Sequence, residues 1–192
     1  YDHFARAAFR LMIDGQDAGE ITLGVPGEHN VYNALAAIAL CRDLGIDMEH
    51  IRAGLKKFTG TNRRFEKKGE IGGVTIIDDY AHHPAELRQS ILSVKELYAG
   101  RKVTGIFQPH LYTRTRDFYR EFAASLSLAD EVLLLPIYPA REEPIEGVCS
   151  DMMLPLISVP AQIVEKERLL EEVTRKNPEL LVTFGAGDID RF

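Results

Sequence analysis

The chain has 192 residues, of which 45% are hydrophobic and 27% are charged, as is typical of a globular protein with an apolar core. Its formal net charge of −6 argues against a general nucleic-acid binder, because phosphate contacts require clustered Lys and Arg. No apolar run approaches the ~20 residues that span a bilayer, and the residues after Tyr1 do not resemble a signal peptide.

The first part of the chain is predicted to form a hairpin followed by helices. Two extended runs, Phe4–Ile13 and Glu20–Val25, flank turn residues 14–17. A helix is then expected from Glu28 to Gly45, with these apolar residues at helical spacing: Val31, Leu35, Ile38 and Ala39. A second short helix is expected after Asp47, a suitable N-cap. Its expected inward-facing residues are Ile51, Leu55 and Phe58.

Beyond the polar stretch 59–62, which we interpret as a domain boundary, strands and helices alternate. Strands are expected near 74–78, 103–107, 131–136 and 180–184, with a short one near 161–164. Helices are expected near 84–98, 116–128, 150–157 and 165–176. Strands separated by helices argue for βαβ units. The predicted fold class is therefore α/β, a doubly wound and mainly parallel sheet, preceded by the hairpin and its helices.

The polar turn 78–84 is the strongest candidate site. It follows a β-branched strand and ends in a proline suited to the first position of a helix. Open α/β sheets bind ligands at the carboxyl ends of their strands, and a helix N-terminus favours anions. Asp78 and Asp79 suit a metal or a ribose hydroxyl, and His82 or His83 suits a substrate-orienting group or a base. An ordinary capped turn is the alternative for some of them.

Two further pairs suit nucleotide recognition. Asn30 and Asn33 are three residues apart at a helix start, so both amides face the same way and can read the edge of a purine. The alternative is helix capping by Asn30, with Asn33 solvated. Arg63 and Arg64 offer planar guanidinium groups that suit phosphate oxygens, although an Arg pair is more often a solvated surface.

A second strand-to-helix turn, residues 107–116, carries Arg114, which suits a carboxylate. The two turns can line one crevice if their strands are neighbours. Alternatively, Arg114 and Arg116 are surface charges that pair with Asp117 or Glu121.

Two later loops are expected at the same edge of the sheet. Residues 139–144 have proline at both ends, which makes a stiff loop. Residues 184–188 contain a G-x-G sequence that permits close approach of a backbone or phosphate, although this signal alone is weak.

Taken together, these stretches resemble the Mur ligases of peptidoglycan synthesis. The matching motifs, in chain order, are GEHNVYNALAAIAL, FTGTNRRFE, DDYAHHPAE, FQPHLYTRTRDF, IYPAREEPIEGV and TFGAGDID. The resemblance implies that residues 1–58 are the C-terminal part of a central ATP-binding domain. It also implies that residues 59–192 are the Rossmann-like C-terminal domain, which docks the amino acid and ATP.

The resemblance implies an amide bond between L-alanine and UDP-N-acetylmuramate, driven by ATP through an acyl phosphate. By position, Asn33, with Asn30, would contact adenine, Arg64 the phosphates and Asp79 the ribose. Mg²⁺ would be held mainly by ATP phosphates and upstream residues, so no metal ligand is expected in this chain.

The same resemblance implies an amino-acid pocket with no nucleophile or other catalytic residue. Tyr80, His82 and Arg114 would position the amino acid, with Arg114 gripping its carboxylate, and His110 would support the pocket. Many members carry arginine at the position of Leu111, so amino-acid binding here would rest on Arg114 and its neighbours.

Other expectations concern the extent of the chain. It starts at Tyr1 and contains no G-x-x-x-x-G-K-[ST] loop, so we expect a fragment that does not catalyse ligation by itself. An exposed apolar patch is expected on residues 1–58, with an artefactual dimer through it. Cys41 and Cys149 fit no metal spacing, so we expect reduced thiols in a cytoplasmic protein without membrane insertion.

Several alternatives stay open. Within the family, the ligase that reattaches recycled murein peptides shares the DD[YF]AHHP turn but not FQPHLYTRT, and folylpolyglutamate-type ligases lack the paired histidines. A non-catalytic nucleotide-binding module would use Asn33, Arg64 and Asp79 without chemistry. A metal hydrolase built on adjacent Asp and His ranks lower, because adjacent residues in an extended turn rarely point at one ion.

Overall fold

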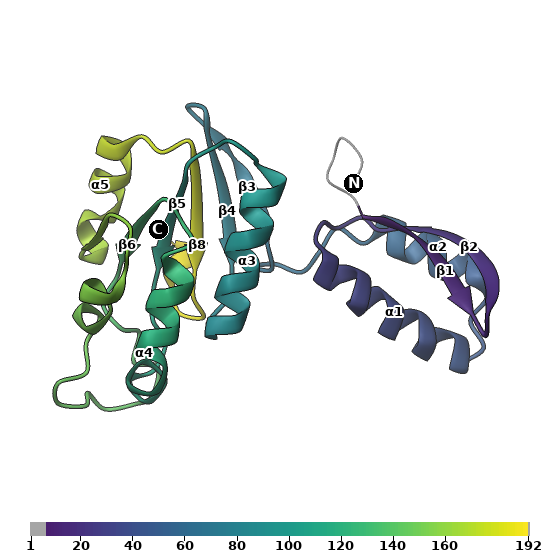
Figure 1. Ribbon diagram of the computed structural model, residues 1–192, viewed down its shortest axis with the longest axis horizontal. Coiled ribbons are helices and arrows are strands. Elements are labelled where there is room, and N and C mark those ends of the chain that lie inside the picture. Colours follow the sequence, from purple (N-terminus) through teal and green to yellow (C-terminus); the bar gives the residue numbers. More distant parts are fainter. Residues whose placement is uncertain (1–6, 192) are drawn as a thin grey trace. The chain divides into compact units, whose positions relative to one another are not determined.

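The computed structural model describes residues 7–191 and divides into two compact units, Tyr1–Thr61 and Asn62–Phe192 (Figure 1). The predicted start of the first strand, at Phe4, lies outside the described residues. In this described part of the chain, no helix is both long and apolar enough to cross a membrane.

The first unit begins with an antiparallel hairpin of β1 (Ala8–Ile13) and β2 (Gln16–Thr22). Its turn is the pair Asp14-Gly15, and both residues have a positive φ, 50° and 78°, as a two-residue hairpin turn requires. The second strand therefore begins four residues before the predicted Glu20. The prediction was wrong because the first residues of β2 are exposed and polar and show no apolar alternation.

Two helices, α1 (Glu28–Asp43) and α2 (Met48–Lys57), follow the hairpin. Asp47 caps α2 as predicted, because its carboxylate accepts hydrogen bonds from the amides of Glu49 and His50. The core of this unit contains Leu11, Ile21, Leu23, Ala34, Ile38 and Ile51. The prediction that Phe58 points inward was wrong: the chain leaves the helix there in an extended conformation, and Phe58 is 48% exposed.

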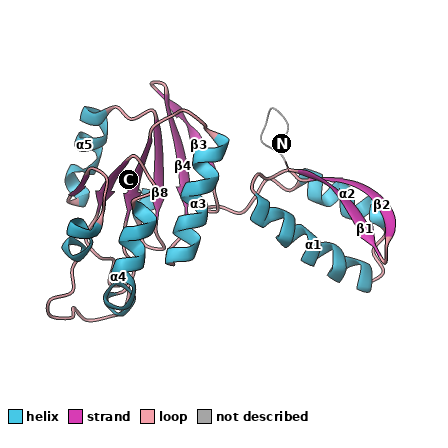
Figure 2. Cartoon of the chain, in the orientation of Figure 1, coloured by secondary structure: helices cyan, strands magenta, loops and turns pink. Residues whose placement is uncertain are grey.

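The second unit is built on a six-stranded sheet (Figure 2). Its strands are β3 (Glu66–Ile71), β4 (Val74–Asp79), β5 (Val103–Phe107), β6 (Glu131–Leu134), β7 (Ala161–Ile163) and β8 (Leu180–Phe184). The order is β3-β4-β8-β5-β6-β7, and every pairing is parallel except that of β3 with β4. The predicted α/β class with a mainly parallel sheet is confirmed. The antiparallel edge strand β3 was not predicted.

The α-helices of this unit are α3 (Pro84–Leu97), α4 (Tyr112–Leu126) and α5 (Leu169–Lys176). Helix α4 begins four residues before its predicted start at Arg116. The predicted helix 150–157 is a 3₁₀ helix, Ser150–Leu156, with Pro155 inside it. The predicted helix 165–176 starts with a 3₁₀ turn, Lys166–Arg168.

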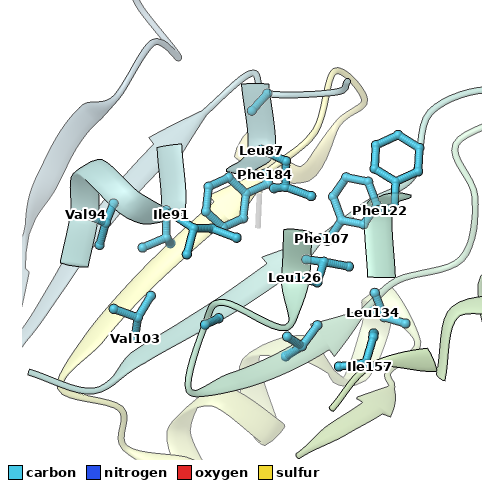
Figure 3. Packing of buried hydrophobic residues seen from close by; sticks show 14 of the residues in the cluster. Leu87, Ile91, Val94, Val103, Phe107, Phe122, Leu126, Leu134, Ile157 and Phe184 are labelled. Carbon is cyan, nitrogen blue, oxygen red and sulfur yellow. The ribbon is translucent and has the colours of Figure 1, made fainter. Parts of the chain in front are cut away.

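Helices cover both faces of the sheet. Helices α3 and α4 pack on one face, where Leu87, Ile91 and Phe122 meet Phe107 and Phe184 of the strands (Figure 3). The opposite face carries α5 through Leu169, against the alternate residues of the same strands. The strands are thus buried on both faces, as parallel strands require. This packing fixes the carboxyl ends of β4, β8, β5 and β6 along one edge.

Candidate functional site

The carboxyl end of β4 carries an ion pair between the buried Asp78 and Arg63. Nε of Arg63 donates to Oδ2 of Asp78 at 3.1 Å, and the hydroxyl of Thr183 donates to Oδ1 at 2.6 Å. The side chain of Asp78 is only 2% exposed. Asp78, one of the two predicted ligand-binding carboxylates, therefore has both oxygens bonded within the protein.

Arg63 also joins this turn to the loop after β8. Its terminal nitrogens donate to the carbonyls of Gly185 at 2.7 Å and Gly187 at 2.9 Å, and it pairs with Asp190 at 3.2 Å. Its own amide and carbonyl bond to Glu66 and to the Tyr80 amide. Arg63 is thus a structural residue rather than a solvated surface charge.

Asp79 ties the turn to α3. Its Oδ1 accepts from the Ala81 amide at 3.1 Å and its Oδ2 accepts from the Ser90 hydroxyl at 2.5 Å. The residue is 8% exposed.

His83 is the N-cap of α3, so the capped-turn alternative holds for this residue. Nδ1 of His83 accepts from the Ala85 amide, and Glu86 accepts from the amides of His82 and His83 in a capping box. Burial raises the pKa of Glu86, but these hydrogen bonds and the charges of His82 and Arg64 outweigh it and lower that pKa overall. The ring of His83 rests against Phe118 at 5.2 Å.

A row of rings crosses the carboxyl ends of the strands. The guanidinium of Arg64 lies 5.3 Å from the centre of the Tyr80 ring, which meets His82 edge-on at 5.3 Å. His82 lies 6.5 Å from His110, and His110 stacks on Tyr138 at 5.7 Å. We call Arg64, Tyr80, His82, His110 and Tyr138 the ring row. It unites Arg64, which lies just before β3, with side chains that follow β4, β5 and β6.

The two predicted turns meet although their strands are not neighbours. The prediction from the sequence required β4 and β5 to be neighbours, but β8 lies between them. The turns approach each other over the glycines that follow β8. A Cβ on Gly185 would lie 2.7 Å from the Gln108 carbonyl, and one on Gly187 would lie 2.8 Å from Cγ of Tyr138. Glycine is therefore needed at both positions.

A polar network supports the far end of the row. Nε2 of Gln108 and Nζ of Lys166 both donate to Oδ1 of Asp188, at 2.8 and 2.6 Å. Burial raises the pKa of Asp188, but these two hydrogen bonds outweigh it and lower that pKa overall. Lys166 also lies 5.5 Å from the centre of the Tyr138 ring. Tyr138 and Lys166 were not chosen from the sequence, because nothing local marks two residues that only the fold brings together.

Arg114 lies beside His110. Its Nη1 is 3.4 Å from Nδ1 of His110, so Nδ1 acts as the acceptor and the proton of the neutral ring lies on Nε2. Burial lowers the pKa of His110 and the charges of Arg114 and His82 lower it further, while the charge of Glu142 opposes them; the net effect favours the neutral ring. The surface-charge alternative holds for Arg116, which pairs with Asp117 at 2.8 Å.

Asn30 and Asn33 lie in the first unit and bond to each other. Nδ2 of Asn33 donates to Oδ1 of Asn30 at 3.2 Å, and Nδ2 of Asn30 donates to the Pro26 carbonyl at 2.6 Å. The alternative in which Asn30 caps α1 was wrong, because Gly27 holds the N-cap position. Their hydrogen bond places both amides on the same side of the helix start, and facing the same way is what their spacing predicted.

Among residues 7–191, no group of three or more His, Cys, Asp and Glu side chains is placed to hold a metal ion. Asp78 and Asp79 are instead bonded to protein groups, which counts against the metal hydrolase alternative.

Comparison with known proteins identifies the family. Residues 63–187 match the family described as Mur ligase, glutamate ligase domain, and so cover roughly two thirds of the chain. The chain belongs to the Mur ligase family. The resemblance seen in the sequence motifs is confirmed.

Individual Mur ligases are similar over nearly the whole chain. This chain is 56% identical over 173 residues to the UDP-N-acetylmuramate–L-alanine ligase of Parabacteroides distasonis, and the match covers 90% of this chain and 37% of that relative. The solved UDP-N-acetylmuramate-alanine ligase of Thermotoga maritima is 34% identical, with a TM-score of 0.79 over 98% of this chain and 41% of that one. This chain therefore spans about two fifths of their length.

A solved murein peptide ligase from Psychrobacter arcticus shares the fold, with a TM-score of 0.64 at 21% identity over 97% of this chain and 40% of that one. Within this Mur ligase chain, the family match includes the whole ring row and Arg114. Asn30 and Asn33 lie before the match, in the first unit.

Proposed function

We propose that this chain is the C-terminal portion of an ATP-dependent ligase that joins L-alanine to UDP-N-acetylmuramate. The observation that carries the proposal is the ring row with Arg114 beside it, at the edge of the sheet where α/β proteins bind ligands. The names of the similar proteins support this choice of substrates.

The amino-acid end of the site is assigned to Arg114, His110, His82 and Tyr80. A guanidinium has five N–H donors, and the hydrogen bond of Arg114 to Nδ1 of His110 uses one of them, on Nη1. The position of Arg114 is therefore compatible with a forked contact to a carboxylate. His110, neutral and protonated on Nε2, adds a fixed donor. These residues would hold the amino acid in place, an effect that can supply several kcal/mol of rate enhancement.

Nucleotide contacts are assigned within each unit separately: Arg64 and Asp79 in the second unit, and Asn30 and Asn33 in the first. Arg64 is exposed and rests on Tyr80, which leaves its charge in reach of phosphate oxygens. Asp79 is held at the carboxyl end of β4 by hydrogen bonds from the Ala81 amide and the Ser90 hydroxyl, and the ribose contact is assigned to it by its position in the family motif. ATP, when bound, would supply the phosphoryl group that activates the muramate carboxylate as an acyl phosphate. Mg²⁺ would be held through the ATP phosphates and upstream residues.

The domain assignment is part of the same proposal. Residues 1–58 would complete the central ATP-binding domain, and residues 59–192 would form the domain that docks the amino acid. The chain alone is expected to be inactive, because the phosphate loop of the family does not occur in its sequence.

The test is phosphate release from ATP in the presence of UDP-N-acetylmuramate and L-alanine. The longer protein that contains this chain should release phosphate in response to L-alanine, well above other amino acids, and the 192-residue chain should not. Turnover only with a recycled murein tripeptide would replace the alanine assignment with the recycling ligase. Nucleotide binding without turnover would favour the non-catalytic module.

A further inference from the structure

Helix α4 has no N-terminal cap of its own. Its N-cap residue is Leu111, which has φ 74° and makes no side-chain cap hydrogen bond. The first amides of a helix need acceptors from outside the helix. The helix that carries Arg114 therefore depends on another part of the chain for its first turn.

The missing acceptor is Glu142, from the loop after β6. Its Oε2 accepts from the Thr113 amide at 3.0 Å, and its Oε1 accepts from the Thr113 hydroxyl at 2.5 Å. The hydrogen bond from the Thr113 hydroxyl, followed by that from the Thr113 amide, lowers the pKa of Glu142. A carboxylate at this position also complements the helix dipole.

The loop that carries Glu142 is itself held in place. The Glu142 amide donates to the Pro139 carbonyl at 2.9 Å, which closes a turn around Ala140. One residue earlier, Tyr138 exchanges backbone hydrogen bonds with Pro109 and Leu111, at 2.8 and 2.9 Å. The carboxylate is thus presented to α4 by a segment that is bonded to the same turn.

Leu111 shows why an external cap matters here. A non-glycine residue with φ 74° is strained, and such a conformation persists only where its surroundings hold it. The amide and hydroxyl of Thr115 hold its carbonyl, at 3.1 and 2.9 Å, but these bonds exist only while the first turn is helical. Loss of the Glu142 cap would let that turn relax and move Arg114 away from His110.

We propose that Glu142 is a positioning residue that fixes Arg114 against His110 by capping α4 from the loop after β6. The effect on L-alanine rests on the proposed function above, whereas the effect on the Arg114–His110 geometry does not. Two measurements separate these consequences.

The geometric measurement uses the 192-residue chain and long-range ¹H–¹⁵N correlation spectra of its histidine rings. The His110 signal is identified by its loss in His110→Gln. In the wild type it should report one neutral form, protonated on Nε2, and in Glu142→Ala a mixture of both tautomers. Glu142→Gln keeps an acceptor and should retain the single form, as should the neighbouring exposed control Glu143→Gln. An unchanged His110 tautomer in folded Glu142→Ala would overturn the proposal.

The kinetic measurement uses the full-length ligase. Glu142→Ala should raise the KM for L-alanine about tenfold and the KM for ATP less than about twofold, because only the amino-acid contact is displaced. Glu142→Gln should restore most of the affinity. Equal changes in both KM values would overturn the assignment of Glu142 to the amino-acid pocket. If the wild type shows no response to alanine, the proposed function fails, and the tautomer spectra still decide the role of Glu142.

A milder variant covers the case in which Glu142→Ala does not fold. Thr113→Val removes only the hydroxyl contact with Glu142 and keeps the amide contact. It should shift the tautomer and the KM for alanine in the same direction by a smaller factor. No shift in either quantity would count against the proposal.

Discussion

Replacing Arg63 by alanine should destabilise the second unit far more than replacing its neighbour Arg64. Arg63 is 17% exposed at its side chain and bonds to Asp78, to Asp190 and to the carbonyls of Gly185 and Gly187. Arg64 is exposed and lies over the Tyr80 ring. The two variants therefore remove the same chemical group from two different environments.

The magnitude follows from what Arg63→Ala leaves behind. Asp78, which is 2% exposed with Arg63 in place, would lose the cation that pairs with it and keep the hydrogen bond from the Thr183 hydroxyl. Removing one partner of a buried ion pair costs about 3–5 kcal/mol. Because Arg63 is partly exposed, we expect the lower end, about 3 kcal/mol, or a fall in Tm of roughly 10 °C. Arg64→Ala should cost less than about 0.5 kcal/mol.

Hydrogen exchange read by mass spectrometry, at increasing urea, measures this cost in peptides from β4 and β8 separately from residues 1–61. Asp78→Asn in the Arg63→Ala background should recover part of the loss, because the amide removes the unpaired charge. Two results would refute the structural role of Arg63: equal losses of unfolding free energy in Arg63→Ala and Arg64→Ala, or a loss below about 1 kcal/mol in Arg63→Ala.

Three further predictions follow. In the full-length ligase, Arg114→Ala should raise the KM for L-alanine far more than that for ATP, since a lost charge-assisted contact costs roughly 1.5–3 kcal/mol; steady-state kinetics with each substrate varied tests this, and equal changes would place Arg114 in another pocket. Gly187→Ala should lower the free energy of unfolding in urea by about 1–3 kcal/mol, because the added Cβ would lie 2.4 Å from Oε1 of Gln108 and 2.8 Å from Cγ of Tyr138. In the control Gly54→Ala, in α2, the added Cβ meets nothing within 4 Å, so the free energy of unfolding should rise by about 0.5–1 kcal/mol. The pKa of His110 is lowered in the folded state, which means that folding favours the neutral ring. The neutral ring therefore contributes to stability above the ordinary histidine pKa of about 6.5, and this contribution is lost as pH falls through the lower pKa of the folded protein. The urea concentration at the unfolding midpoint should therefore be lower at pH 5 than at pH 7, and this difference should be smaller in His110→Gln. An equal difference in the wild type and in His110→Gln would exclude His110 as its cause.

The fold was predictable where burial leaves a mark in the sequence. Strands β5 and β8 are buried on both faces and appear as short apolar runs. Strand β3 was missed because its residues, EKKGEI, lie at the edge of the sheet and are mostly exposed. The start of α4 was missed because its first turn is capped by Glu142, 29 residues beyond Thr113, rather than by a local residue.

The candidate site was predictable in composition but not in assembly. The turns after β4 and β5 were chosen correctly as the places where polar groups collect, and their histidines do meet. Their meeting depends on β8 and its two glycines, which belong to the last strand of the chain. Periodicity reports only local structure, so neither the position of β8 between β4 and β5 nor the contact of Lys166 with Tyr138 was visible from it.

The structure also explains how an acidic chain presents an edge suited to anions. Carboxylates near the ring row are bonded inward: Asp78 to Arg63, Asp79 to Ser90, Glu86 to backbone amides, Glu142 to Thr113 and Asp188 to Lys166. In each case the negative charge is compensated by a donor group of the protein itself. Arg64 and Arg114, in contrast, contact rings rather than carboxylates. The net charge of −6 therefore does not describe this edge, where Arg64 is exposed, Arg114 is half-buried and the nearby carboxylates already accept hydrogen bonds from protein donors.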